Sequence, residues 1–283
     1  MRENLLPLVN AVLYSDIFGY ALTREELFRY AVGKCSVKDL HAFMKDPPNF
    51  ICCEDGFICL KINSQNINLR KNRRQINNKK LEIAKKIARI LSFIPSIRFI
   101  GLSGSVAMQN ADSSDDIDFF IITESHSIWK TRLLTTLIVK LLGKKREKNH
   151  TDFDNKICLN MFMSNDNLKL SNDRQDLYTA HEVVQLIPLI DKNNTYKYFL
   201  SENKWIHNFL PNAMEIISFK RSFLKYKKLT LFESFAKAMQ LRYMEKNRTI
   251  EKVNDKILAF HPIDYRTRTL KEYNDRKEKY ASV

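Results

Sequence analysis

Residues 101 to 122 limit the possible folds of this chain most strongly, because a turn of small residues leads there into a strongly apolar strand that begins with paired acidic residues. Side chains alternate along a strand, so Asp116 and Asp118 are expected to leave the same face. Two neighbouring carboxylates repel each other unless a cation lies between them, and oxygen ligands of this kind suit Mg²⁺. The pattern therefore predicts a divalent metal site at the start of the strand.

The turn that precedes the strand contains Ser103, Gly104 and Ser105. Glycine lets a backbone approach a triphosphate closely, and hydroxyl and N–H groups at a helix N-terminus bind phosphate oxygens. Ten residues, 106–115, separate this turn from Asp116, which is enough for a helical turn and a loop that bring the turn back beside the carboxylates. We therefore expect the three residues to bind nucleotide phosphates. In the alternative interpretation, an acidic loop meets an apolar strand and Gly104 only closes a turn.

The Gly-Ser turn, the spacer and the Asp-x-Asp strand together resemble the signature of the DNA polymerase beta nucleotidyltransferase superfamily. Most of the chain is also similar to a group of bacterial nucleotidyltransferase-domain proteins with a winged-helix-like N-terminal region. That similarity is carried by residues 16–18, 22–23, 103–107, 116–118, 129, 132, 158–160, 180–182, 203–205 and 210–212. The resemblance implies an enzyme that transfers a nucleoside monophosphate from an NTP, with Mg²⁺ or Mn²⁺ held by the catalytic residues Asp116 and Asp118.

The same resemblance implies a third carboxylate on the neighbouring strand, which we expect at residues 157–163. The polar residue at the central position there is Asn160, whose amide can ligate a metal but cannot accept a proton. Three hypotheses follow from this departure. Asp152, Asp154 or Glu182 replaces the missing group, or one ion suffices because the acceptor is already ionised, or the site binds a nucleotide without reaction.

Two other polar positions are predicted to contribute to nucleotide binding. Asn160 remains a candidate ligand, and Arg132 lies on a helix expected over residues 127–142, where a guanidinium could clamp a phosphate with two hydrogen bonds. A surface ion pair is the alternative for Arg132. His181 and Glu182 are expected either to point at the cleft or to satisfy each other between domains.

The periodicity of apolar residues predicts an α+β protein with three domains. Residues 1–69 combine three short helices with a hairpin around an Asp-Gly turn, which is the pattern of a winged helix. Residues 70–166 begin with a basic helix over 76–94 and then alternate strands and helices, as a small mixed-sheet nucleotidyltransferase core requires. Residues 167–283 are predicted to form an all-helical domain, with one of its helices over 250–258.

A formal net charge of +15 favours polyanionic partners, whose attraction falls as the salt concentration rises. An RNA end is therefore the preferred acceptor, ahead of DNA, a small molecule or a protein side chain. The basic residues that precede the candidate site are either a nucleic-acid contact or a solvated helix face; they are Lys79, Lys80, Lys85, Lys86 and Arg89. An AT-rich genome is the other explanation for such a lysine-rich composition.

The location of the protein is predicted from what the sequence lacks. Its apolar runs are shorter than a membrane span, and its first residues include polar groups where a secretion signal would be apolar. The five cysteines form no disulfide or zinc pattern. We expect a cytoplasmic protein without a membrane partner. A second class of function is also open, namely a degenerate transferase that senses nucleotide or binds nucleic acid as a regulator.

Overall fold

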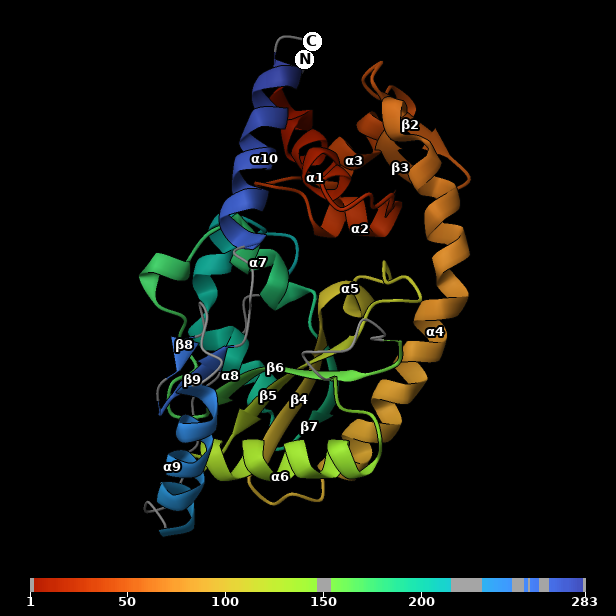
Figure 1. Ribbon diagram of the computed structural model, residues 1–283. Helices are drawn as coiled ribbons and strands as arrows, with labels where there is room; N and C mark the ends of the chain where they lie inside the picture. Colours follow the sequence, from red (N-terminus) through yellow and green to blue (C-terminus); the bar gives the residue numbers. More distant parts are fainter. Residues whose placement is uncertain are drawn as a thin grey trace.

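The computed structural model describes residues 3–146, 154–214, 231–245, 252–253, 255–259 and 265–281 (Figure 1). These residues form a mixed α and β structure with two sheets. The smaller sheet belongs to the N-terminal part of the chain, and the larger sheet uses strands between residues 97 and 259. The long helix α4 (Gln65–Leu91) connects the two parts along one side of the molecule.

The N-terminal part packs three helices against a short antiparallel sheet. Its helices are α1 (Leu6–Asp16), α2 (Arg24–Arg29) and α3 (Val37–Lys45), with 3-10 turns η1 (Glu3–Leu5) and η2 (Lys61–Asn63) at its ends. Its strands are β1 (Leu22–Thr23), β3 (Phe57–Leu60) and β2 (Ile51–Glu54), in the order β1-β3-β2. Capping boxes begin α2 at Thr23 and α3 at Ser36, because the side chain of each cap and the acidic side chain three residues later accept each other's backbone N–H.

The larger sheet has the strand order β7-β4-β5-β6-β9-β8. The strands are β4 (Ile97–Ser103), β5 (Ile117–Thr123), β6 (Ile157–Ser164), β7 (Ile187–Asp191), β8 (Lys252–Val253) and β9 (Ile257–Ala259). Among these described strands, β5 and β6 are parallel and every other neighbouring pair is antiparallel. The short helix α5 (Gly104–Ala107) joins β4 to β5, and α6 (Ile128–Leu141) begins the crossover from β5 to β6.

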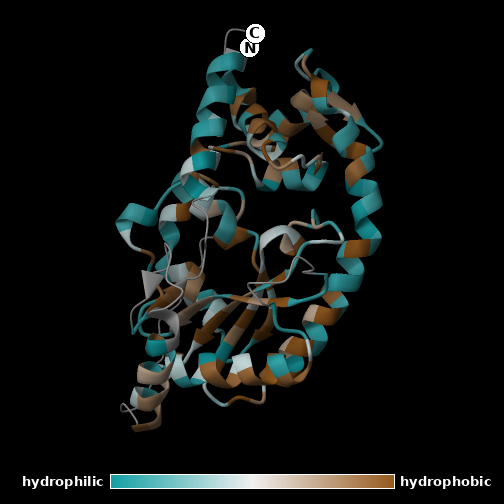
Figure 2. Ribbon diagram, in the orientation of Figure 1, coloured by the Kyte–Doolittle hydropathy of each residue, from teal (hydrophilic) through white to brown (hydrophobic). Residues whose placement is uncertain are grey.

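The two faces of this sheet belong to different hydrophobic clusters. Along β5, Phe119 and Ile121 pack with apolar residues of α4 and α6, whereas Phe120 and Ile122 pack with residues of α1, α7 and α8. Figure 2 shows the strands as mainly hydrophobic and the outer turns of α4 and α10 as mainly hydrophilic. Because side chains alternate, Asp118 shares its face with Phe120 and is therefore directed toward the side of α7.

The expectation that residues 167–283 are all-helical is wrong. This region contains η3 (Asn172–Arg174), α7 (Leu177–Val184), α8 (Thr195–Glu202), η4 (Lys204–Asn208), α9 (Leu231–Glu245) and α10 (Tyr265–Ala281), but it also supplies β7, β8 and β9. In place of the helix expected over 250–258, β8 and β9 form an antiparallel pair that extends the sheet beyond β6. Short apolar segments do not distinguish helix from strand, and an open sheet edge decides their conformation. The sequence also predicts a helix over residues 213–221, most of which lie outside the described residues.

One long helix crosses a limit expected for the domains, and another packs against the N-terminal part of the chain. α4 begins at Gln65, so the expected boundary between residues 69 and 70 lies inside a helix. α10 packs beside α1, where Arg276 forms an ion pair of 3.2 Å with the buried Asp16 (Figure 1). Within the described parts of the chain, no helix combines the length and the apolar character that crossing a membrane requires.

Candidate metal and nucleotide site

The end of β4 and the start of β5 form the centre of the candidate site. Ser103 and Asp118 are paired across these antiparallel strands, and α5 begins at the next residue, Gly104. Gly104 has a φ of +67°, and a Cβ atom there would lie 2.5 Å from Oδ2 of Asp118. The backbone conformation and the close approach of the carboxylate therefore both require glycine at this position.

Three potential ligand atoms converge beside this turn. The ligand atoms of Asp116, Asp118 and Cys158 all lie within 4.8 Å of one another, and all three residues are partly buried. Asp116 immediately precedes β5, so the two carboxylates lie on one side of the strand, as their spacing predicts. Two carboxylates at this separation fit a Mg²⁺ or Mn²⁺ ion, which prefers oxygen ligands.

Cys158, and not Asn160, lies opposite Asp118 on the neighbouring strand. The register pairs Asp118 with Cys158, and an irregularity between Asp118 and Phe120 then shifts the pairing so that Phe120 faces Met161. The Cys158 thiol donates a hydrogen bond to the Asp118 carboxylate, and burial raises the pKa of this thiol well above its usual value. A neutral thiol is a poor ligand for Mg²⁺, so the position expected for a third carboxylate supplies no hard ligand.

Arg146 is a residue of the site that the sequence did not single out. Its Nη1 lies 2.5 Å from Oδ2 of Asp116 and 3.8 Å from Sγ of Cys158. The backbone fixes this position, because the N–H of Arg146 donates to the carbonyl of Ile157, and Lys145 forms a parallel bridge with the same residue. Although burial opposes its charge, the adjacent Asp116 raises the pKa of Arg146, which therefore stays cationic.

The electrostatic environment of the site opposes ionisation of Asp118. Burial and the adjacent charge of Asp116 raise its pKa to about 7, against the opposing effects of Cys158 and Arg146. The carboxylate of Glu182 on α7 contributes to this rise, so it acts on Asp118 from the facing helix. A divalent cation would favour the ionised form of Asp118, because it replaces repulsion by attraction.

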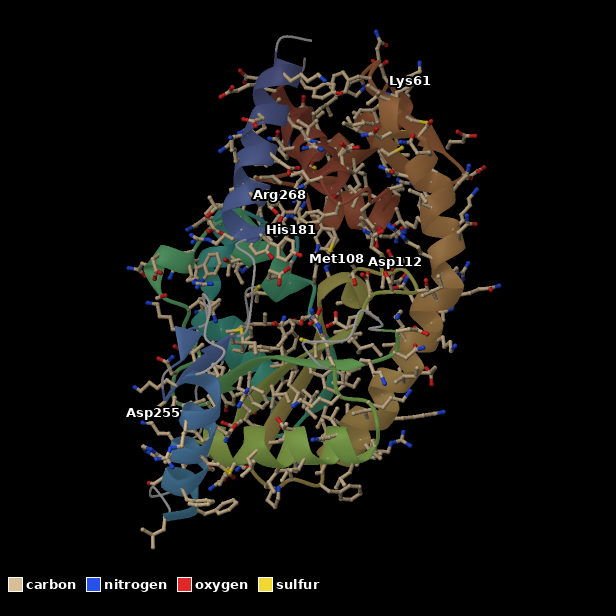
Figure 3. All side chains as sticks on the ribbon, in the orientation of Figure 1. Lys61, Met108, Asp112, His181, Asp255 and Arg268 are labelled. Atoms are coloured by element: carbon tan, nitrogen blue, oxygen red, sulfur yellow. The ribbon has the colours of Figure 1, made fainter. Side chains whose placement is uncertain are left out.

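Glu182 and His181 do not satisfy each other, because they leave different sides of α7. His181, labelled in Figure 3, is buried and stacks on Tyr14 of α1 at a centroid distance of 4.0 Å. Burial lowers the pKa of His181 to about 3, so it remains neutral. Glu182 is partly buried, and burial raises its pKa to about 7. Of the two residues, Glu182 is therefore the candidate for proton transfer near Asp118.

Lys80 is a buried residue that binds the loop before Asp116, so it does not contribute to an exposed basic surface. It is 1% exposed, and its Nζ donates to the carbonyl oxygens of Ser113 and Asp115 at 3.0 and 2.6 Å. These contacts hold the loop that carries Asp112 (Figure 3) and leads to Asp116. The same amino group contacts Asp154 at 3.3 Å, so this candidate for the third carboxylate is held at Lys80. The candidate Asp152 lies outside the described residues.

The remaining sequence-predicted residues differ in their distance from the metal ligands. The Ser103 hydroxyl lies 3.4 Å from the backbone carbonyl of Asp118, and Ser105 lies in the first turn of α5. Arg132 instead donates a hydrogen bond of 2.5 Å to Gln240 of α9. Asn160 is partly buried on β6, two residues beyond the cysteine that faces Asp118.

We compared the chain with models of protein families, with curated proteins and with solved structures, and none of the three comparisons gave a match. The features that bear on its function are the side chains around Asp116 and Asp118 and the turn that faces them.

Proposed function

We propose that this protein is a Mg²⁺- or Mn²⁺-dependent nucleotidyltransferase of the DNA polymerase beta-like superfamily, which transfers a nucleoside monophosphate from an NTP to an acceptor. The observation that carries the proposal is the convergence of Asp116 and Asp118 against the Gly104 turn. A metal-bound triphosphate needs carboxylates for the cation and a glycine turn for the phosphates. Here the turn follows β4 and the carboxylates lie at the start of the neighbouring strand β5. The cation would neutralise phosphate charge and orient the α-phosphate.

The fold supports the same proposal. The pair β4 and β5 delivers the turn and the carboxylates to one end of a sheet, and the crossover through α6 places β6 parallel to β5. We assign this part to a nucleotidyltransferase core. We assign the N-terminal helices and the sheet β1-β3-β2 to a winged-helix-like unit, which their order of helices and hairpin supports. The five free cysteines support a cytoplasmic location.

In the reaction, an acceptor oxygen attacks the α-phosphorus and the bond from this phosphorus to the oxygen that bridges to the β-phosphate breaks, so pyrophosphate leaves. Ser103, Gly104 and Ser105 orient the phosphates with hydroxyl and backbone N–H groups, and Asp116 and Asp118 hold the cation. A hydroxyl acceptor must lose a proton. Glu182, with a pKa of about 7, is the carboxylate that we assign to accept it. The net charge of +15 favours an RNA end as the acceptor.

Incubation with each labelled NTP, Mg²⁺ or Mn²⁺ and total RNA tests this proposal. We expect label in RNA and stoichiometric pyrophosphate release with the wild type, and neither with Asp116→Asn. Arg268→Gln is the matched control, because Arg268 is 73% exposed on α10 and pairs with Glu272 of the same helix at 2.8 Å. Equal pyrophosphate release from Asp116→Asn and the wild type would refute the proposal.

The presence of Cys158 opposite Asp118 favours a second candidate function. A site without a third hard ligand could bind a nucleotide and signal its presence without reaction. This regulatory protein would bind labelled NTP in equilibrium dialysis but release no pyrophosphate with any acceptor. Gel shifts across a salt series test separately whether the basic surface binds nucleic acid, since such binding weakens steeply as salt rises.

A further inference from the structure

We propose that Arg146 is the phosphate-binding arginine of the site, and that it alternates between Asp116 in the ion-free protein and an NTP phosphate when a cation is bound. This inference rests on the proposed function. It assigns to Arg146 the phosphate-binding role that the sequence predicts for Arg132. In the structure Arg132 contacts α9.

The position of the guanidinium supports this role. Nη1 of Arg146 contacts the carboxylate oxygen Oδ2 of Asp116, which is also the kind of atom that would bind the cation. The guanidinium and a divalent ion therefore compete for Asp116. A divalent ion at this carboxylate repels the adjacent arginine, and a phosphate is the nearest acceptor of matching charge and geometry once an NTP is present.

The burial and the backbone contacts of Arg146 allow the exchange. Its side chain is 34% exposed, compared with 16% for Asp116, so the guanidinium is more accessible to solvent than the carboxylate that it contacts. The main chain of residues 144–146 is tied to Ile157 by hydrogen bonds. A rotation of the side chain, with the backbone in place, can therefore move the charge away from the carboxylate.

The inference predicts that one substitution changes two affinities in opposite directions. In Arg146→Gln the competitor for Asp116 is lost, so binding of Mn²⁺ alone should tighten about twofold to fivefold, as expected for removal of a partly exposed ion pair. Binding of a non-hydrolysable NTP in the presence of Mn²⁺ should weaken at least about tenfold, because a charge-assisted hydrogen bond to phosphate is lost.

Electron paramagnetic resonance of free Mn²⁺ and equilibrium dialysis of the labelled NTP analogue measure the two affinities. Arg146→Lys keeps the charge without the forked geometry, so it should retain the competition with Mn²⁺ but bind the analogue more weakly than the wild type. Arg268→Gln changes the net charge equally, on exposed α10, and should change neither affinity. Near-UV circular dichroism confirms that each variant is folded.

Unchanged or weaker Mn²⁺ binding in Arg146→Gln overturns the inference, and so does unchanged binding of the analogue. In either case a wild type that binds Mn²⁺ through Asp116 leaves the proposed function in place. If the wild type binds neither Mn²⁺ nor the analogue, both the proposed function and the exchange are wrong.

Discussion

Replacement of Asp118 by Asn should stabilise the ion-free protein while it abolishes metal binding. Burial and the charge of Asp116 raise the pKa of Asp118 from 3.8 to about 7, so the ionised form is unfavourable in the folded state. Each pKa unit corresponds to about 1.4 kcal/mol, which gives an upper value of about 4 kcal/mol at neutral or higher pH. Because the residue is partly exposed, we expect a gain of about 2 to 4 kcal/mol in the free energy of unfolding.

The gain should depend on pH in a defined direction. Between the unfolded and the folded pKa of Asp118 the folded wild type binds more protons than the unfolded chain, so its stability falls as the pH rises through about 4 to 7. Asn carries no charge at any of these values. The stability difference between Asp118→Asn and the wild type should therefore vanish near pH 4 and be complete above about pH 7.

Thermal and urea unfolding in buffer with a chelator measure this difference. A stabilisation of about 2 to 4 kcal/mol corresponds to a rise in Tm of about 3 to 7 °C for a chain of this size. Asp55→Asn is the matched control, since Asp55 is 55% exposed and pairs with Lys71 on the surface, and its effect should stay within about 0.5 kcal/mol. An Asp118→Asn variant that is no more stable than the wild type near pH 8, or that is equally stabilised near pH 4.5, would refute the reasoning.

Three other substitutions test separate parts of the site. Gly104→Ala places a Cβ atom 2.5 Å from Asp118 at a positive φ, so we expect a loss of about 1 to 3 kcal/mol in urea unfolding and weaker Mn²⁺ binding; an unaffected variant would show that the turn is not tightly packed. Lys80→Met leaves the carbonyls of the loop before Asp116 without their donor and should cost about 2 to 4 kcal/mol, whereas the exposed Lys85→Met should be nearly neutral. Cys158→Ser should weaken Cd²⁺ binding in competition titrations and leave Mg²⁺ binding unchanged, because a thiol is a soft ligand; equal loss for both ions would make the residue a structural support only.

The sequence predicts those residues of the site whose positions depend on neighbouring residues in the chain. Strand alternation places Asp116 and Asp118 together, and the requirement for a small residue at a close approach identifies Gly104. The helix expected over residues 127–142 is also present as α6, with ends within one residue of the expectation. These features depend on residues that are close in the sequence.

The features that the sequence did not predict depend on pairing between distant segments. The register between β5 and β6 pairs Cys158 with Asp118, whereas the sequence favoured Asn160 because it is the polar residue at the centre of the strand. Arg146 reaches Asp116 only because its backbone pairs with Ile157, and a run of basic residues gives no sign of such a contact. The register of a sheet and long-range ion pairs are set by tertiary structure, which periodicity does not encode.

Crystals soaked with Mn²⁺ and a non-hydrolysable NTP test the central claim most directly, because anomalous scattering locates the ion without assumptions. The account predicts a peak at bonding distance from carboxylate oxygens of both Asp116 and Asp118, with the triphosphate against the Ser103 to Ser105 turn. The absence of a peak there, with the ion or the nucleotide bound elsewhere on the protein, would contradict it.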